Sequence, residues 1–412
     1  MNFRLKPAAK KAIAIGGLCS VAYLAVYVAK NILSAATPQI TAAGAFTVER
    51  IGALSSTYYI CYAIGQLING YIGDKIKAKY MISFGLMLAS VGFWLLPQLS
   101  GLDVAATIAY GASGFFMAMI YGPMTKVVAE NTEPLYATRC SMGYTLASFL
   151  GSPAAGVLAA SMAWEWAFRA SGGIMVVMAT ICLIVFTAME RKGLVRYNQY
   201  KPKEKGVGNL KILLKRQILR FAMIAVLTGV IRTAVLFWLP TYISQYLNFD
   251  PSTAALVYTV GTLLVSSSTF LAIFAYEKVF RQNMDLTILV SFAASAASFA
   301  GAFLVPVTMP VVNIAFMVLA ILTANCASNM IWSRYCPSLF DTGMVSGATG
   351  FLDCCSYLAA SAATVLFANA VADIGWGKLI LVWMGLMVVG IAFSLPFKRK
   401  RTEAALPVEK TE

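Results

Sequence analysis

Long apolar runs, separated by short polar segments, follow one another along almost the whole chain. Each run has 18 residues or more, and a helix of about 20 residues is long enough to cross the ~30 Å hydrocarbon core of a membrane. The pattern therefore predicts an all-α integral membrane protein with twelve transmembrane helices. We expect the spans at 12–44, 51–72, 80–97, 104–128, 138–163, 166–189, 221–247, 252–276, 285–306, 310–333, 343–370 and 376–397.

The composition supports this fold class. Of the 412 residues, 59% are hydrophobic and 12% are charged, whereas a soluble globular chain has about half apolar and a quarter charged residues. Disordered, fibrous and ordinary soluble-enzyme classes are therefore excluded. The first apolar run is much longer than that of a signal peptide and has no small-residue cleavage site, so we expect it to remain in the mature protein.

The excess of basic residues, 32 Lys and Arg against 17 Asp and Glu, is unevenly distributed along the chain. Basic residues gather in the amino-terminal tail, in the loop after the second span, in the carboxyl-terminal tail and in segment 190–220, which has ten basic and two acidic residues. By the positive-inside rule, both termini and this segment are cytoplasmic in a multi-pass protein of the cell membrane, plasma or inner. The charge thus indicates topology and attraction to anionic lipid, and no nucleic-acid partner is expected.

Residues typical of catalytic and metal sites are scarce. The sequence has no histidine, and its eight cysteines have no C-x-x-C spacing. It also has no nucleotide-binding P-loop, G-x-S-x-G or H-E-x-x-H motif. We therefore expect no metal, no cofactor and no enzymatic activity.

The spans divide into two sets of six around the basic segment, an arrangement typical of secondary transporters with a site near the bilayer midplane. Each half has an acidic and a basic residue after its second span, Asp74 with Lys75 and Glu277 with Lys278. We predict an amino-terminal six-helix bundle (1–189), a basic cytoplasmic linker (190–220), a carboxyl-terminal six-helix bundle (221–397) and a cytoplasmic tail (398–412).

A short motif after the second span resembles a family signature. Gly70, Asp74, Lys75 and Lys79 match the G-x-x-x-D-[RK]-x-x-x-[RK] pattern of the major facilitator superfamily. The resemblance implies a fold of two six-helix bundles, in which the acidic residue latches the bundles on the cytoplasmic side. We therefore predict gating roles for Asp74 and Lys75, and for Glu277 and Lys278 in the second half.

Span seven carries a narrower resemblance. Residues 232–242 match the R-x-x-V-L-x-W-x-P-T-Y stretch of the organophosphate:phosphate antiporters, which include glycerol-3-phosphate and hexose-phosphate transporters. Tyr23, Tyr27 and Lys30 are similar to that group's first span, and Tyr62 matches a pore tyrosine twelve residues before the signature Asp. The resemblance implies transport of an organic phosphate in exchange for inorganic phosphate.

Two cations inside spans indicate an anion site independently of the family. A cation at the centre of a spanning helix costs about 2.5 to 3.5 kcal/mol on insertion scales, so it is rarely idle. Lys30 and Arg232 lie in spans one and seven, which occupy equivalent places in the two halves. Arg can hold two phosphate oxygens with its planar fork, and Lys adds a compact charge. Tyr23 and Tyr27 share a helical face with Lys30 and either donate to the anion or pack between helices.

The sequence also departs from the family pattern. The glycerol-3-phosphate transporters have Arg at the position of Lys30, a histidine near Ser148 and an acidic residue at Phe237. Asp353 in span eleven has no counterpart in those relatives. It either offsets one cation, exchanges a proton or has a structural role. The predicted substrate-binding residues are Lys30, Arg232, Tyr23, Tyr27, Tyr62 and Asp353.

Three functions remain open. The preferred one is a secondary active transporter of an organic phosphate or related organic anion that works by alternating access. The second is a proton-coupled symporter of a non-phosphorylated anion such as a sugar acid, and the third is a membrane sensor of sugar phosphates. The partners expected are the anionic substrate and, as coupling ion, inorganic phosphate or a proton. We expect a monomer.

Overall fold

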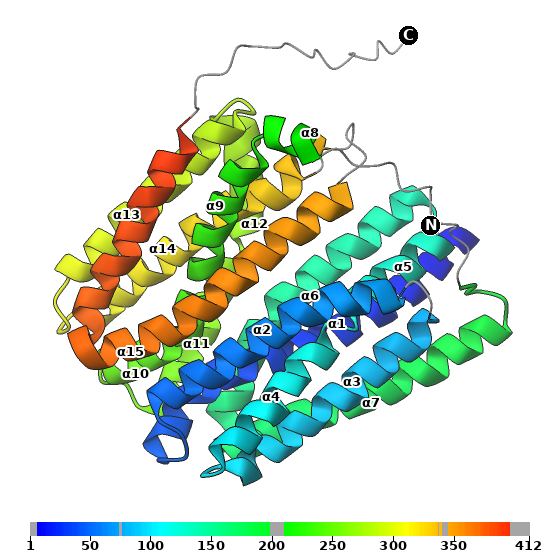
Figure 1. Cartoon of the computed structure of the whole chain (residues 1–412), viewed down its shortest axis with the longest axis horizontal. Coiled ribbons are helices and arrows are strands. Elements are labelled where there is room, and N and C mark those ends of the chain that lie inside the picture. The colour runs from blue at the N-terminus through cyan, green and yellow to red at the C-terminus, as the bar shows by residue number, and fades with distance from the viewer. Residues whose placement is uncertain (1–5, 74–75, 198–209, 337, 340–344, 396–412) are drawn as a thin grey trace, which may run out of the picture.

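The computed structural model describes residues 6–73, 76–197, 210–336, 338–339 and 345–395. These residues form helices and no strands, which confirms the predicted all-α class (Figure 1). Nine of the described helices are long and apolar enough to cross a membrane. One of these nine, Ala348–Ser394, contains the last two predicted spans.

The amino-terminal half contains seven α-helices and one short 3-10 helix, and the helix bounds follow the predicted spans closely. The fourth span is divided into α4 and α5. The elements are α1 (Pro7–Ala42), α2 (Val48–Gly73), α3 (Ala78–Leu95), η1 (Leu96–Leu99), α4 (Asp103–Met117), α5 (Tyr121–Asn131), α6 (Pro134–Ser161) and α7 (Trp164–Arg191).

The carboxyl-terminal half alternates α-helices with π-helical segments, and it begins with a short helix that the span pattern did not predict. The elements are α8 (Leu210–Lys215), α9 (Ile218–Gly229), η2 (Val230–Val235), α10 (Leu236–Gln245), α11 (Pro251–Ser266), α12 (Ser268–Phe274), η3 (Ala275–Val279), α13 (Met284–Leu304), α14 (Pro310–Met330), η4 (Ile331–Tyr335) and α15 (Val345–Ser394).

Local sequence signals account for several helix starts. Proline occupies the first turn of α1, α6, α11 and α14, where its missing N–H costs no helical hydrogen bond. The side chain of Asp250 accepts a hydrogen bond from the Thr253 amide and caps α11, and Asn283 caps α13 in the same way. These caps fix where the loops end and the spans begin.

The last two predicted spans are continuous in α15, so the expected loop between 370 and 376 is absent there. Gly375 breaks the helix with φ 75° and ψ 167°. This backbone conformation is open to glycine because glycine has no Cβ. The chain reverses direction at this one residue, as Figure 1 shows at the foot of the orange helix.

The two halves pack against each other through four main helix pairings. α1 crosses to α10 and α11, α2 packs against α15, and α6 packs against α11. Hydrogen bonds between the halves include Ser34 Oγ to the Phe237 carbonyl at 2.6 Å and Ser56 to Ser361 at 2.8 Å. In Figure 1 the halves meet on the side where α1 ends and diverge on the side where α1 begins, near the N label.

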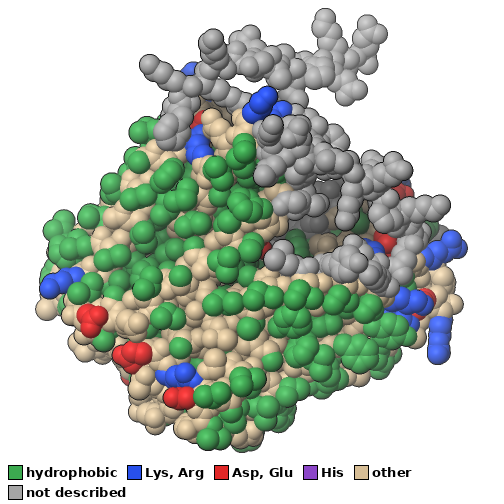
Figure 2. All heavy atoms as spheres, in the orientation of Figure 1, with side chains coloured by type: hydrophobic (Ala, Val, Ile, Leu, Met, Phe, Trp, Pro, Cys, Tyr) green, Lys and Arg blue, Asp and Glu red, His purple; other side chains and the backbone are tan. Residues whose placement is uncertain are grey.

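The outer surface suits a lipid environment. Many large apolar side chains are exposed on the outside of the bundles, among them Leu304 at 77% and Phe270 at 68%. Figure 2 shows hydrophobic side chains spread over this face, with most of the visible charges near the helix ends. The helices therefore present apolar surface outward and keep their polar positions for the interior.

Candidate functional site

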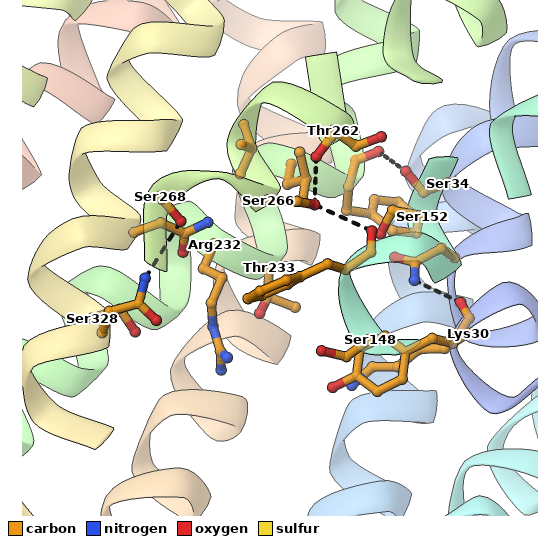
Figure 3. Close-up of a pocket in the computed structure, with 18 of the residues that line it drawn as sticks. Lys30, Ser34, Ser148, Ser152, Arg232, Thr233, Thr262, Ser266, Ser268 and Ser328 are labelled. Carbon is orange, nitrogen blue, oxygen red and sulfur yellow. Dashed lines mark hydrogen bonds between the residues drawn. The ribbon is translucent and has the colours of Figure 1, made fainter. Parts of the chain in front are cut away.

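A cavity lies between the two halves, in the middle of the membrane-spanning region. It contains about 900 Å³ of atom-free space, part of it open to solvent. α1, α2 and α6 line it from one side, and η2, α10, α11, α12, α14, η4 and α15 line it from the other (Figure 3). Its position between equivalent helices of two bundles is typical of transporter substrate sites.

Lys30 is the cation of the amino-terminal half in this cavity. Its side chain is buried, and its Nζ donates a hydrogen bond of 2.9 Å to the Tyr357 hydroxyl of the other half. The Nζ also lies 4.4 to 5.7 Å from the ring centroids of four tyrosines, two of them on α2. Ring quadrupoles attract a cation, so this tyrosine cage stabilises the buried charge without a carboxylate in contact. The cage consists of Tyr27, Tyr59, Tyr62 and Tyr357.

Arg232 is the cation of the carboxyl-terminal half. It lies in η2, the π-helical turn between α9 and α10, and its side chain extends into the open space (Figure 3). Within the described part of the chain its Nε has no hydrogen-bond partner, although it is buried. Its Cζ lies 6.0 Å from the Tyr357 ring centroid. Arg232 therefore keeps donor capacity for a ligand.

Tyr357 connects the two cations, since it accepts from Lys30 and lies beside Arg232. The sequence reasoning did not include it among the site residues. The available signal was its place one helical turn after the predicted site residue Asp353 in span eleven. Its contacts with both halves depend on how α15 packs against α2, and this packing has no local sequence signature.

The predicted tyrosines take different places. Tyr27 lines the cavity, whereas Tyr62 lies behind it, with its ring 5.3 Å from that of Tyr357. Tyr23 lies one turn before Tyr27 on α1, and its ring is 4.9 Å from that of Tyr27 and 5.4 Å from that of Tyr121. Tyr23 and Tyr62 thus support the Lys30 environment and are not among the residues that line the cavity.

Asp353 lies one helical turn before Tyr357 on α15 and is half-buried. Asp353 is thereby placed near both cations, since Tyr357 accepts from Lys30 and lies beside Arg232. No hydrogen bond or ion pair holds its carboxylate within the described residues. It is not among the residues that line the cavity, but it shares a helical face with Tyr357, which does, so it lies at the margin of the cavity.

Neutral polar groups make up much of the remaining lining, and the sequence analysis named only Ser148 among them. Asn329 accepts from Thr269 at 3.1 Å and donates to Ser268 at 3.4 Å. Because these bonds join α14 to α12, they hold the Asn329 amide in place in the cavity lining that also contains Arg232. The neutral lining residues are Asn31, Ser34, Ser148, Ser152, Thr233, Thr262, Ser266, Ser268, Asn325, Ser328 and Asn329.

The predicted gate residues are only partly described. Asp74 and Lys75 lie outside the described residues. Glu277 forms an ion pair of 2.9 Å with Arg334, and Lys278 is exposed. Glu277 and Arg334 belong to η3 and η4 of the same half, so this ion pair does not join the halves in the conformation shown.

A second charged cluster stabilises the corresponding end of the amino-terminal half. Lys77 and Lys79 both contact Glu190, at 2.7 and 2.6 Å. The hydrogen bond and charge of Glu190 raise the pKa of Lys77. This cluster joins the start of α3 to the end of α7, which again keeps the interaction within one half.

The geometry can bind an anion but offers nothing for metal chemistry among the residues described. Those residues contain no cluster of three or more His, Cys, Asp or Glu placed to hold a metal ion. None of the described cavity-lining residues is acidic. Two cations surrounded by hydroxyl and amide groups favour a polar anion with hydrogen-bonding substituents.

Comparisons with known proteins agree with the fold described above. A phosphoglycerate transporter protein of Salmonella typhimurium is 23% identical over 93% of this chain and 89% of its own length. The membrane sensor protein UhpC of Escherichia coli is 22% identical over 92% of this chain and 90% of its own length. The crystal structure of a bacterial homologue of the lysosomal transporter Spinster superposes with a TM-score of 0.73 at 11% identity, covering 95% of this chain and 97% of that one.

The family model of the Major Facilitator Superfamily matches residues 19–364. This match confirms the predicted family, and the relatives confirm the resemblance to organic-phosphate proteins. The expectation that the chain is no enzyme is confirmed as well, because this is a transporter family. The chain is a multi-pass membrane protein that belongs to the Major Facilitator Superfamily.

Proposed function

We propose that the protein transports an organic phosphate across the membrane by alternating access, in exchange for inorganic phosphate. The observation that carries this proposal is the pair of Lys30 and Arg232, which reach one cavity from opposite halves. A phosphate group bound by both side chains neutralises charge and links the two halves. The Salmonella relative, named as a phosphoglycerate transporter, supports the same substrate class.

The packing of the halves supports alternating access. The hydrogen bonds of Ser34 and Ser56 join the halves on the side away from Pro7. On the opposite side, the ion pairs of Glu190, Glu277 and Asp285 each stay within one half. The conformation therefore corresponds to a cavity that opens toward the side where α1 begins, which is the cytoplasm by the positive-inside rule. We place the protein in the plasma or inner membrane with both termini cytoplasmic.

Counterflow in reconstituted vesicles tests the proposal. Vesicles containing the purified chain are loaded with inorganic phosphate, and uptake of a labelled organic phosphate is measured without a pH gradient. We expect uptake that depends on internal phosphate and is lost in Arg232→Gln. Uptake that needs no internal phosphate would refute exchange, and absence of any phosphate transport or binding would refute the substrate class.

A proton-coupled symporter is the second candidate, and the unpaired carboxylate of Asp353 favours it. A carboxylate beside the cavity can take up and release a proton during the cycle. Under this function an imposed pH gradient drives uptake into vesicles without internal phosphate, and Asp353→Asn removes the dependence on the gradient. The relative named as a membrane sensor makes the transport assay necessary, since a sensor binds its ligand without moving it.

A further inference from the structure

The carboxylate of Asp353 is not accounted for by phosphate recognition alone. An ionised acid inside a membrane protein is costly unless it is paired, bonded or functional. Asp353 is half-buried, and within the described part of the chain it has neither a hydrogen bond nor an ion pair. Its helix holds it one turn from Tyr357, the residue that connects both cations.

The cations beside Asp353 are not used to neutralise it. Lys30 donates its hydrogen bond to Tyr357, and Arg232 keeps a free Nε. Both contact Tyr357, one turn from Asp353, yet neither forms an ion pair with Asp353 among the described contacts. Lys30, Arg232 and Asp353 therefore lie in one region without direct ion pairs. Two positive charges and one negative charge give this region a net charge of one positive.

The surroundings of Asp353 across the cavity are aromatic. Tyr357 lies one turn away on the same helix, and the ring of Tyr62 of the amino-terminal half lies 5.3 Å from the Tyr357 ring. A carboxylate with tyrosine rings nearby is a suitable environment for an ammonium group, because both attract a cation.

We infer that the substrate is a zwitterionic organic phosphate, with its phosphate between Lys30 and Arg232 and a protonated amine at Asp353. This inference rests on the proposed function and narrows its substrate class. A dianionic phosphate that carries one ammonium group has one net negative charge, which complements the net charge of the site. A hydroxyl in place of the amine would leave the carboxylate without a counter-charge in the occluded site.

Matched pairs of phosphate esters test the inference. Binding of 2-aminoethyl and 2-hydroxyethyl phosphate, and of the three- and four-carbon pairs, is measured by titration calorimetry on the full chain in detergent. For the chain length that fits best, we expect the amine to bind about tenfold tighter or more, since an unpaired buried charge is costly. Asp353→Asn should remove this preference while the phosphate group still binds.

Asp373→Asn is the matched control, because it makes the same change on α15 at an exposed position two residues before Gly375. It should leave the amine preference unchanged. Equal binding of amine and hydroxyl esters at every length would overturn the inference and leave the proposed function standing. Absence of binding by either ester would overturn both. If Asp353→Asn does not fold, the ratio measured on the unmodified protein still decides.

Discussion

The two halves of the cavity hold their cations in different ways. Lys30 lies in the regular helix α1 and is enclosed by four tyrosine rings. Arg232 lies in the π-helical segment η2 and keeps an unpaired nitrogen. π-helical turns re-aim side chains and are frequent at functional sites. The comparison indicates that Lys30 is held in a fixed position with one N–H already bonded, whereas Arg232 has more donors left for a ligand.

The difference extends beyond the cations. The carboxyl-terminal half has three π-helical segments, and each contains a charged residue, namely Arg232, Glu277 or Arg334. In the described part of the amino-terminal half, no such segment occurs. Because a π-turn weakens the regular hydrogen-bond ladder, we expect the carboxyl-terminal half to deform more during transport.

Neutralising Arg232 should produce the largest effect. Arg232→Gln is expected to lower vesicle uptake about 100-fold or more, because loss of two charge-assisted hydrogen bonds costs on the order of 3 kcal/mol. Arg232→Lys should restore little, since the planar fork is lost. Arg191→Gln, a change at an exposed residue, is the matched control. Uptake of Arg232→Gln at the unmodified rate would refute the assignment of Arg232 as a ligand-binding cation.

Lys30 should tolerate a conservative change better. Lys30→Arg keeps the charge inside the tyrosine cage, so we expect uptake within about tenfold of the unmodified protein, since Arg also binds aromatic faces. Lys30→Met should abolish uptake because one of the two cations is lost. The assay is the same counterflow measurement. Full activity of Lys30→Met would show that the caged charge is structural.

The Lys30–Tyr357 hydrogen bond should have a moderate effect. Tyr357→Phe removes the one hydrogen bond described for Lys30 and keeps the ring. We expect a change of about fivefold in KM, equivalent to ~1 kcal/mol for one net hydrogen bond. Tyr59→Phe, which also keeps a ring of the cage, should change KM less. A larger effect for Tyr59→Phe than for Tyr357→Phe would contradict the role given to the Lys30–Tyr357 hydrogen bond.

The Glu277–Arg334 ion pair should have a smaller effect. Both side chains are more than one-third exposed, and such pairs contribute about 0–1 kcal/mol. Glu277→Gln should therefore change the labelling rate of cysteines engineered into the cavity by only a few-fold. The exchanged pair Glu277→Arg with Arg334→Glu should restore the original labelling rate. The sequence prediction for Asp74 is tested in parallel with Asp74→Asn. If neither variant changes labelling or transport, the gating assignment is wrong.

The cap of α11 should show the smallest effect and a defined pH dependence. Hydrogen bonds from Ser252 and Thr253 lower the pKa of Asp250. A lowered pKa means that the stabilisation is present above the unfolded value of about 3.9 and is lost as the pH falls through the folded value. Asp250→Ala should therefore lower the melting temperature slightly at pH 7 and less at pH 3, whereas Asp250→Asn should keep the cap. An equal loss at both pH values would contradict this account.

The sequence by itself determined the membrane class, the family and both cations. Apolar runs of spanning length, and charges that are expensive inside them, are properties of single segments and need no tertiary contact. The motif at Gly70 to Lys79 and the stretch from Arg232 to Tyr242 were sufficient for the family prediction, which the family model confirmed.

Only the tertiary structure decided how the site is assembled. The tyrosine cage combines rings of α1, α2 and α15, and the π-turn at Arg232 forms within a sequence that reads as an ordinary helix. Tyr357 therefore escaped prediction, and Tyr23 and Tyr62 proved to lie behind the cavity wall. The physical reason is that contacts between helices far apart in the chain depend on packing angles and helix register, which the period of a single span does not specify.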